Sequence, residues 1–212
     1  MSGLSNNTNY NSTLVSIVQG SFRIRCNEGD RDSVSRVNKS GNVVYETKYS
    51  NLSGYIKSMV IEDTEFGKKM NLIILADKDY KLSLGYADSL TVNIYKMLPN
   101  INPHQEILIT LQRKPDDKGV DKTSLFISQE GHPIKWAFTR DNPNGMPAME
   151  QIMLKGEKVW DNTKQVDFLY EKSVLPFIKT IPSSFTESND DWSKEFTNTI
   201  DSSAEEESII PF

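Results

Sequence analysis

The sequence has few of the residues on which catalytic and metal sites depend. Its 212 residues include one cysteine, Cys26, and two histidines, His104 and His132. A single cysteine excludes an internal disulfide and a multi-cysteine zinc site, and its default setting is intracellular. Neither GxxxxGK[ST] nor GxGxxG occurs, so a glycine-rich phosphate loop is excluded. Each histidine stands beside a proline, with no nucleophile placed near it. We therefore expect no enzyme, no metal site and no cofactor.

Long apolar runs are also missing. No stretch approaches the ~20 apolar residues of a membrane-spanning helix. The first 13 residues are rich in Ser, Asn and Thr and lack the apolar segment of a secretory signal. The sequence therefore predicts a cytoplasmic protein with no membrane association.

Charge is distributed unevenly along the chain. Residues 183–212 contain eight acidic residues and one base, a net charge of −7. The other residues contain 23 bases and 21 acids, a net charge of +2. The total of −5 thus combines a mildly basic body with a strongly acidic end, and the body remains open to a polyanionic ligand. By mimicry of its negative charges, the acidic end is expected to compete with such a ligand for the body.

Hydrophobic periodicity predicts a chain that is mainly β with some helix (α+β). Strands are expected at 21–26, 34–38, 43–49, 54–62, 70–76, 80–84, 106–112 and 123–128, with 134–138 as a further strand and 113–122 as a charged loop. The period changes to that of a helix at 87–98 and at 162–174, and prolines end both segments. Gly41 and Gly67 lie in the expected hairpin turns 39–42 and 64–68.

The order of the central elements suggests an architecture. Three consecutive strands, a helix and two more strands follow one another between residues 54 and 128. This is the order of the OB-fold, a five-stranded Greek-key barrel with one helix between strands 3 and 4, although other small α+β meanders share it. We expect a flexible arm over 1–19, an OB-fold domain over 20–180 with an extra N-terminal hairpin and a C-terminal helix, and a largely disordered acidic tail over 181–212.

Aromatic and basic residues recur together along these strands. Aromatic faces stack on bases while Lys and Arg pair with phosphates, so the mixture is typical of proteins that bind single-stranded nucleic acid. Phe66, at a hairpin tip, suits a stacking contact. The alternative is that strand aromatics belong to the core and that single basic residues are merely solvated. The candidate ssDNA-binding residues are Arg23, Arg25, Tyr45, Lys48, Tyr49, Tyr55, Lys57, Phe66, Lys68, Lys69, Tyr86, Arg113, Lys114, Lys135, Trp136 and Arg140.

The C-terminus combines acidic residues with apolar ones. A solvated acidic tail has no need of large apolar residues at its end, so we interpret the segment as a hook for a partner protein. Phe212 would enter an apolar pocket, its carboxylate would pair with a base, and the upstream acids would meet a basic ridge. The alternative is that 209–212 docks on the chain's own body. The tip consists of Glu205, Glu206, Glu207, Ile209, Ile210, Pro211 and Phe212.

The acidic end with Ile210-Pro211-Phe212 resembles that of the single-stranded-DNA-binding proteins (SSBs) of bacteria and their phages. The block 54–100, with Glu65-Phe66-Gly67-Lys68 between strands and Met97-Leu98-Pro99-Asn100 ending a helix, is similar to phage-type SSBs. The resemblance implies an OB-fold that coats ssDNA during replication, recombination and repair, and a tip that recruits proteins of those processes. Ser208 and Ile209 separate the acids from the last three residues, the acids are Glu rather than Asp, and the usual Gly/Gln/Pro-rich linker is missing. These departures lead us to expect a divergent, phage-encoded member, although a bacterial origin stays open. It would act in the bacterial cytoplasm, which is the host cytoplasm if a phage encodes it.

Two other function classes stay open. One is a structural or assembly protein of a phage or cell, whose tail docks on a neighbouring copy. The other is an RNA-binding OB protein, which competition between matched DNA and RNA would reveal because the 2′-OH is then read. No coiled-coil heptad fixes the oligomeric state, so a homo-oligomer also stays open.

Overall fold

The computed structural model describes residues 12–38, 40–116 and 119–185, and these are mainly β, as the sequence predicts. The strands are β1 (Thr13–Val18), β2 (Ser21–Arg25), β3 (Ser33–Val37), β4 (Val43–Tyr49), β5 (Asn51–Thr64), β6 (Gly67–Leu75), β7 (Asp79–Gly85), β8 (Ile107–Pro115), β9 (Asp121–Gln129), β10 (His132–Pro133), β11 (Glu150–Leu154) and β12 (Glu157–Asp161). The helices are α1 (Ser89–Met97), α2 (Thr163–Leu169) and α3 (Leu175–Ile178), with a π-helical segment Tyr170–Val174 and short 3₁₀ turns at Leu98–Asn100 and Ser183–Phe185.

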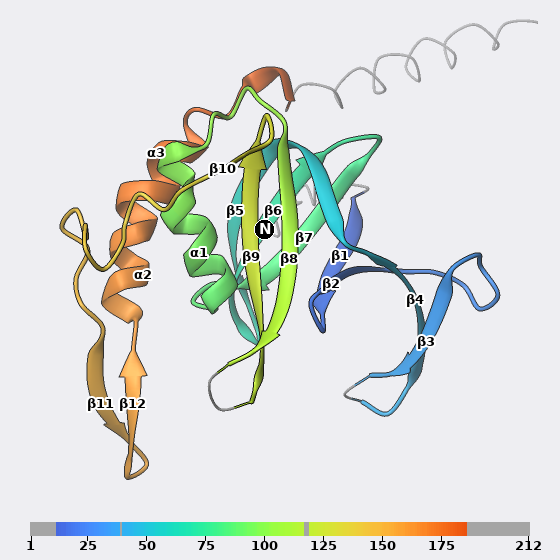
Figure 1. The fold of residues 1–212 in the computed structure, drawn as a ribbon, viewed down its shortest axis with the longest axis horizontal. Helices are drawn as coiled ribbons and strands as arrows, with labels where there is room; N and C mark the ends of the chain where they lie inside the picture. The colour runs from blue at the N-terminus through green and yellow to red at the C-terminus, as the bar shows by residue number, and fades with distance from the viewer. Residues whose placement is uncertain (1–11, 39, 117–118, 186–212) are drawn as a thin grey trace, which may run out of the picture.

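Ten of the described strands form one mixed sheet in the order β10-β9-β8-β5-β6-β7-β1-β2-β4-β3, and β11 pairs with β12 in a separate hairpin. β1 lies parallel to β7, whereas the other described pairs are antiparallel. The sheet is open and does not close into a five-stranded barrel, because β1 occupies the edge of β7 that a closing strand would need. Figure 1 shows the β3–β4 hairpin at one end of the molecule and the helices with β11–β12 at the other.

The long strand β5 joins the two halves of the sheet. Its first residues, Asn51–Gly54, pair with β8, and the rest pairs with β6. The change of partner occurs at Gly54, where φ is +146° and a Cβ would lie 2.4 Å from the carbonyl oxygen of Leu75. A bulge follows at Lys57, where the register with β6 shifts. A glycine and a bulge together let the strand bend, so both halves face one core.

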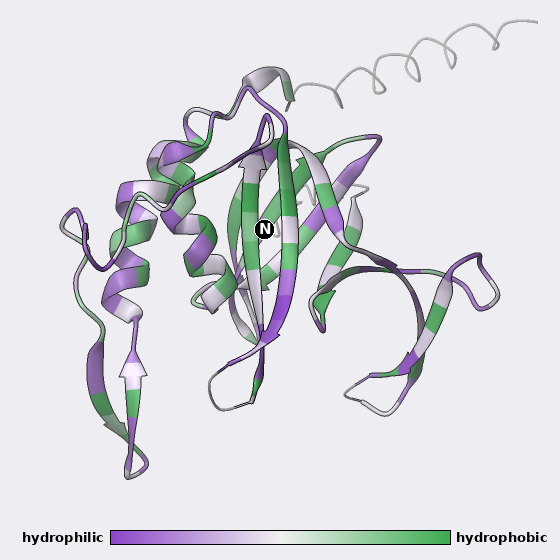
Figure 2. Ribbon diagram, viewed as in Figure 1, coloured by the Kyte–Doolittle hydropathy of each residue, from purple (hydrophilic) through white to green (hydrophobic). Residues whose placement is uncertain are grey.

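The core lies between these two halves. Alternation with a period of two puts Met70, Leu72 and Ile74 of β6 on the inner face, where each is fully buried. Ile94 and Tyr95 of α1 are equally buried and belong to the same cluster, so the helix covers one end of the core. Figure 2 shows hydrophobic residues concentrated in β5, β6 and β8.

At the N-terminus, the structure corrects the predicted flexible arm. Thr13–Val18 is the strand β1, which bonds to β2 and β7. Val15 is 2% exposed and packs in the core, so the apolar residues among these polar neighbours are sufficient to order the segment. Residues 1–11 of the predicted arm lie outside the described part of the chain.

Other boundaries also differ. Of the described segment after β9, His132–Pro133 pairs with β9 as a strand. The predicted strand 134–138 is irregular, because Phe138 packs in the core and the Ala137 N–H donates to the Lys96 carbonyl. The predicted loop 113–122 is shorter, since β8 and β9 pair as far as Pro115 and Asp121. The second helical segment continues past Pro176, because the π-helical segment Tyr170–Val174 runs directly into α3, in which Pro176 is the second residue. The sequence did not predict the β11–β12 hairpin.

Candidate nucleic-acid interface

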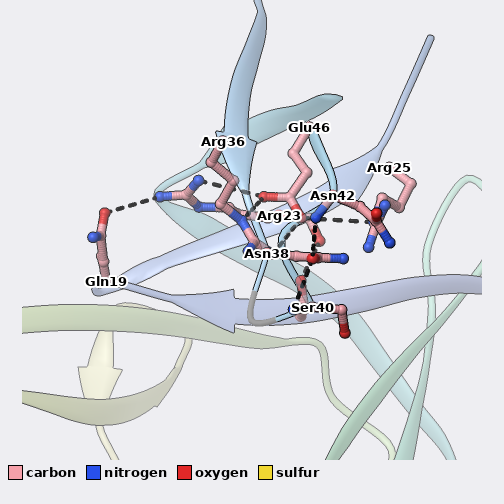
Figure 3. Close-up of polar contacts among 9 residues, drawn as sticks. Gln19, Arg23, Arg25, Arg36, Asn38, Ser40, Asn42 and Glu46 are labelled. Atoms are coloured by element: carbon pink, nitrogen blue, oxygen red, sulfur yellow. Dashed lines mark hydrogen bonds and ion pairs between the residues drawn. The ribbon is translucent and has the colours of Figure 1, made fainter. Parts of the chain in front are cut away.

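A buried carboxylate gathers three arginines on the sheet formed by β2, β4 and β3. Glu46 of β4 is 1% exposed. The register places Arg25 of β2 directly opposite Glu46. Arg23 of the same strand and Arg36 of β3 reach Glu46 diagonally. Figure 3 shows the three guanidinium groups around this one side chain. Pairing of the strands thus brings three of the 24 basic residues of the chain together around one acid.

The contacts of Glu46 leave positive charge in excess. Arg36 donates from Nε and Nη2 to the two carboxylate oxygens, at 2.7 Å each. Arg23 Nη1 lies 3.3 Å and Arg25 Nε 3.7 Å from the carboxylate. The hydrogen bonds from Arg36 lower the pKa of Glu46 by more than burial raises it, so the group stays ionised. Three positive charges surround one negative charge, and Arg25, 63% exposed, presents the excess to solvent.

Two of the candidate residues are buried in ion pairs. Arg23 is 4% exposed and also donates from Nη2 to Oε1 of Gln19, at 3.4 Å. Lys57 is 4% exposed, and its Nζ lies 2.7 Å from Oδ2 of Asp79. Strand alternation predicted that Arg23 and Lys57 face a ligand. Glu46 and Gln19 instead bond to Arg23. The bulge in β5 turns Lys57 to the buried side of the strand. These two residues position their neighbours and are closed to a ligand.

The outward face of β7 continues into the arginine-bearing strands. Lys81 of β7 lies beside Leu14 of β1, and Ser16, two residues further along β1, is on the same face. Ser16 pairs with Arg23 of β2, which pairs with Lys48 of β4. Lys48 is exposed and shares the parity of Glu46 in β4. We call the surface formed by Arg25, Arg36 and Lys48 the arginine face. Sequence reasoning missed Arg36, although it lies in a predicted hairpin two residues from Val34 and therefore on the same face of the strand.

Arg113 of β8 lies beside the turn between β1 and β2. A Cβ on Gly20, in that turn, would lie 2.6 Å from the Cβ of Arg113. The neighbouring Gln19 accepts a hydrogen bond from the buried Arg23. Arg113 itself forms an ion pair with Asp121, and the exposed Lys114 follows it. Nothing local in the sequence indicates this approach between segments about 90 residues apart.

The β5–β6 hairpin presents an aromatic ring to solvent, as the sequence predicts. Phe66 is 83% exposed at its tip. The Thr64 hydroxyl donates to the Gly67 carbonyl at 2.6 Å and accepts from the Phe66 N–H at 3.3 Å, so the turn is held in one conformation. Lys68 is exposed with its Nζ 5.8 Å from the centre of the Tyr86 ring.

The residues behind this hairpin are less accessible. Lys69 is half-buried and pairs with Gly85. Tyr86 packs edge-on against Tyr95 and Tyr170, and burial raises its pKa to about 12. Tyr86 therefore supports the hairpin more than it offers a free stacking surface.

The other candidate tyrosines differ in exposure. Tyr49, at the end of β4, is 45% exposed on the face opposite Lys48. Tyr55 is 38% exposed, but its ring lies 5.6 Å from that of Phe185. Tyr45 is half-buried, and its hydrogen bond with Glu28 raises its pKa. Tyr49 is thus the most accessible of the three.

The structure separates one candidate group from the arginine face. Lys135, Trp136 and Arg140 are exposed in the segment after β10. This segment lies against α1, where Lys96 Nζ is 5.3 Å from the centre of the Trp136 ring. α1 and the β3–β4 hairpin are at opposite sides of the molecule in Figure 1. These three residues therefore do not share a surface with Arg25 and Lys48.

Glu205 to Phe212, the predicted tip, lie outside the described residues. Within the described ranges, no group of three or more His, Cys, Asp or Glu side chains could hold a metal ion. None of the helices described there has the length and apolarity to cross a membrane.

No protein-family model matches the chain, and comparison with curated proteins and with solved structures gave no significant match. The chemistry of the residues themselves is therefore the basis for a function.

Proposed function

We propose that this chain is a non-enzymatic protein that binds single-stranded DNA, coats it and protects it. The arginine face carries the proposal. A net excess of positive charge is held on a sheet surface by a buried carboxylate, and guanidinium groups bind phosphates strongly. Because Glu46 fixes the arginines before a ligand arrives, less side-chain freedom is lost on binding.

The strand order supports an OB-type body. In the run β9-β8-β5-β6-β7, the bent strand β5 is shared between both halves, and α1 follows the third strand of the set. An OB-fold is a partly open barrel that binds oligonucleotides on its second and third strands and on the loops 1–2 and 4–5. The equivalents here are β6, β7, the Phe66 hairpin and the loop 116–120. The outward face of β7 leads directly to the arginine face.

Exposed aromatic rings favour an unpaired strand as the ligand. Phe66 and Tyr49 offer faces on which unstacked bases can lie, and a duplex keeps its bases inside. The resemblance of the chain's end to SSBs favours DNA over RNA. It also supports recruitment of replication and recombination proteins by Glu205 to Phe212, in the cytoplasm of a phage-infected bacterium.

A second candidate function is assembly, and one observation favours it. Met153, Leu154 and Trp160 of the β11–β12 hairpin are each more than half exposed. Apolar side chains on a projecting hairpin suit contact with another protein or another copy of the chain. Light scattering of the purified protein distinguishes the candidates, because an assembly protein that ignores oligonucleotides would oligomerise without DNA.

The proposed function is tested with two double charge reversals. Arg25→Glu with Lys48→Glu removes two phosphate contacts from the arginine face. Lys135→Glu with Arg140→Glu changes net charge equally on the α1 side. The affinity for labelled oligo-dT is measured by fluorescence anisotropy at several salt concentrations. Only the first double variant should lose about two phosphate contacts, which reduces the slope of log affinity against log salt concentration by about 1.4. Equal behaviour of the two variants would contradict the assignment of the arginine face.

A further inference from the structure

A small pocket lies where the N-terminal strands meet the bend of β5. Val15, Phe22 and Ile24 belong to its apolar lining, and Tyr49 and Tyr80 line it as well. Its volume is about 180 Å³. Pockets for drug-sized ligands measure ~300–1,000 Å³, so this one admits a single ring system and not a whole nucleotide.

One residue of the lining, Tyr80, is held in place by its neighbours. The Tyr80 hydroxyl donates to Oδ1 of Asp77 at 2.9 Å. Lys78 Nζ lies 5.4 Å from the centre of the Tyr80 ring, a cation–π distance. Burial and the bond to Asp77 raise the pKa of Tyr80 to about 12, so the hydroxyl remains a donor at neutral pH. An aromatic ring held in this way can stack on a planar ligand with little loss of its own freedom.

Part of the remaining lining is polar. Asn51, Ser53 and Asp77 also line the pocket, and all three are exposed to water. Oδ1 of Asp77 accepts from Tyr80, and no described residue donates to Oδ2. A heterocycle with N–H groups on one edge can replace the water at these polar groups, whereas an all-carbon ring cannot.

We propose that this pocket holds one unstacked nucleobase of the bound strand, with its hydrogen-bonding edge toward Asn51 and Asp77 and an adjoining phosphate near Lys78. The inference rests on the proposed ssDNA binding and adds a defined subsite to it. Asp77 and Phe66 lie at opposite ends of β6, a strand of nine residues, or roughly 30 Å. The base pocket and the Phe66 tip thus lie at the two ends of β6, and Tyr49 lines the pocket from the face opposite that of Lys48.

The pocket selects for bases that donate. A carboxylate accepts well from the amino group of cytosine, whereas the single N–H of thymine lies between two carbonyl oxygens that a carboxylate repels. One dC within oligo-dT should therefore raise affinity about fivefold. Asp77→Asn should abolish that gain. Asp141→Asn, an equal change of charge in an exposed loop on the α1 side, should retain it.

Photo-cross-linking locates the base directly. Full-length protein is irradiated with oligo-dT carrying 5-iodouracil, and the cross-linked peptide is identified by mass spectrometry. We expect attachment at Tyr49 or Tyr80, and about a tenfold loss of affinity in Tyr49→Ala. Unchanged affinity in Tyr49→Ala with cross-links confined to other peptides would overturn the pocket alone. A wild-type protein that binds no oligonucleotide would refute the proposed function itself.

Discussion

At Glu46, three guanidinium groups share one carboxylate that water scarcely reaches. A buried ion that loses its partner is strongly destabilising, because the remaining charges stay desolvated. The same residue therefore supports the fold of β2, β3 and β4 and sets the positive potential of the arginine face.

Replacement of Glu46 by Gln is expected to lower the free energy of unfolding by about 3 kcal/mol at pH 7. The pKa of Glu46 lies below its ordinary value. Its contribution is therefore present above the unfolded pKa of about 4.3 and is lost as the pH falls through the folded pKa. Urea unfolding at pH 7 and in steps below pH 4.3 should show a fall in wild-type stability that is smaller in Glu46→Gln. Equal pH dependence of the two proteins would refute this role.

Gly54 tests the bend in β5. Alanine there meets the Leu75 carbonyl oxygen at 2.4 Å and the Ile74 side chain at 2.8 Å, with φ at +146°. We expect Gly54→Ala to lose about 3 kcal/mol in urea unfolding, from overpacking and backbone strain together. Gly41→Ala is the control, since Gly41 also has positive φ but nothing within 4 Å of its Cβ position. A loss no greater than that of the control would show that β5 bends without need of glycine.

At the scale of elements, a substitution in the β5–β6 hairpin can change DNA binding without changing the stability of the fold. Phe66 is 83% exposed, so its ring adds little to the core. Phe66→Ala should weaken oligo-dT binding about tenfold, the loss of one stacked base, and leave the urea midpoint unchanged. Val60→Ala, at an exposed apolar residue within β5, should leave binding unaltered. Unchanged affinity in Phe66→Ala would exclude the tip as a stacking contact.

Elements with a local signal could be predicted from the sequence. Alternation and turn glycines identified β3–β4 and the run β5, β6, β7, and the change of period at Leu90 and Ile94 identified α1. β1 was missed because Ser and Thr surround its apolar residues, and its burial depends on the distant strand β7. Lys57 was misplaced because one extra residue at a bulge reverses strand parity.

At the scale of the whole molecule, the site depends on contacts between distant segments. Arg25 and Phe66 could be proposed from their own neighbourhoods. The approach of Arg113 to Gly20, and the gathering of Arg23, Arg25 and Arg36 around Glu46, follow from strand order and register, which local periodicity does not contain. The separation of Trp136 from the arginine face has the same origin.

The charge of the whole chain gives a further prediction. Residues 186–212 hold eight acids and one base, a net charge of −7. A chain ending at Phe185, which keeps the contact between Phe185 and Tyr55, should bind ssDNA more tightly and with a steeper salt dependence. Anisotropy titrations of both chains at low and high salt measure the difference. Weaker binding by the shortened chain would contradict competition between the acidic segment and DNA.

The central claim is that the basic sheet surface binds single-stranded DNA. Its most direct test is titration of the full-length protein with oligo-dT, matched oligo-rU and duplex DNA, followed by tryptophan fluorescence and by anisotropy of labelled strands at low and high salt. We predict saturable binding of oligo-dT that is tighter than that of the duplex or of oligo-rU and that weakens as salt rises. No response to any nucleic acid at low salt would contradict the account and favour the assembly function.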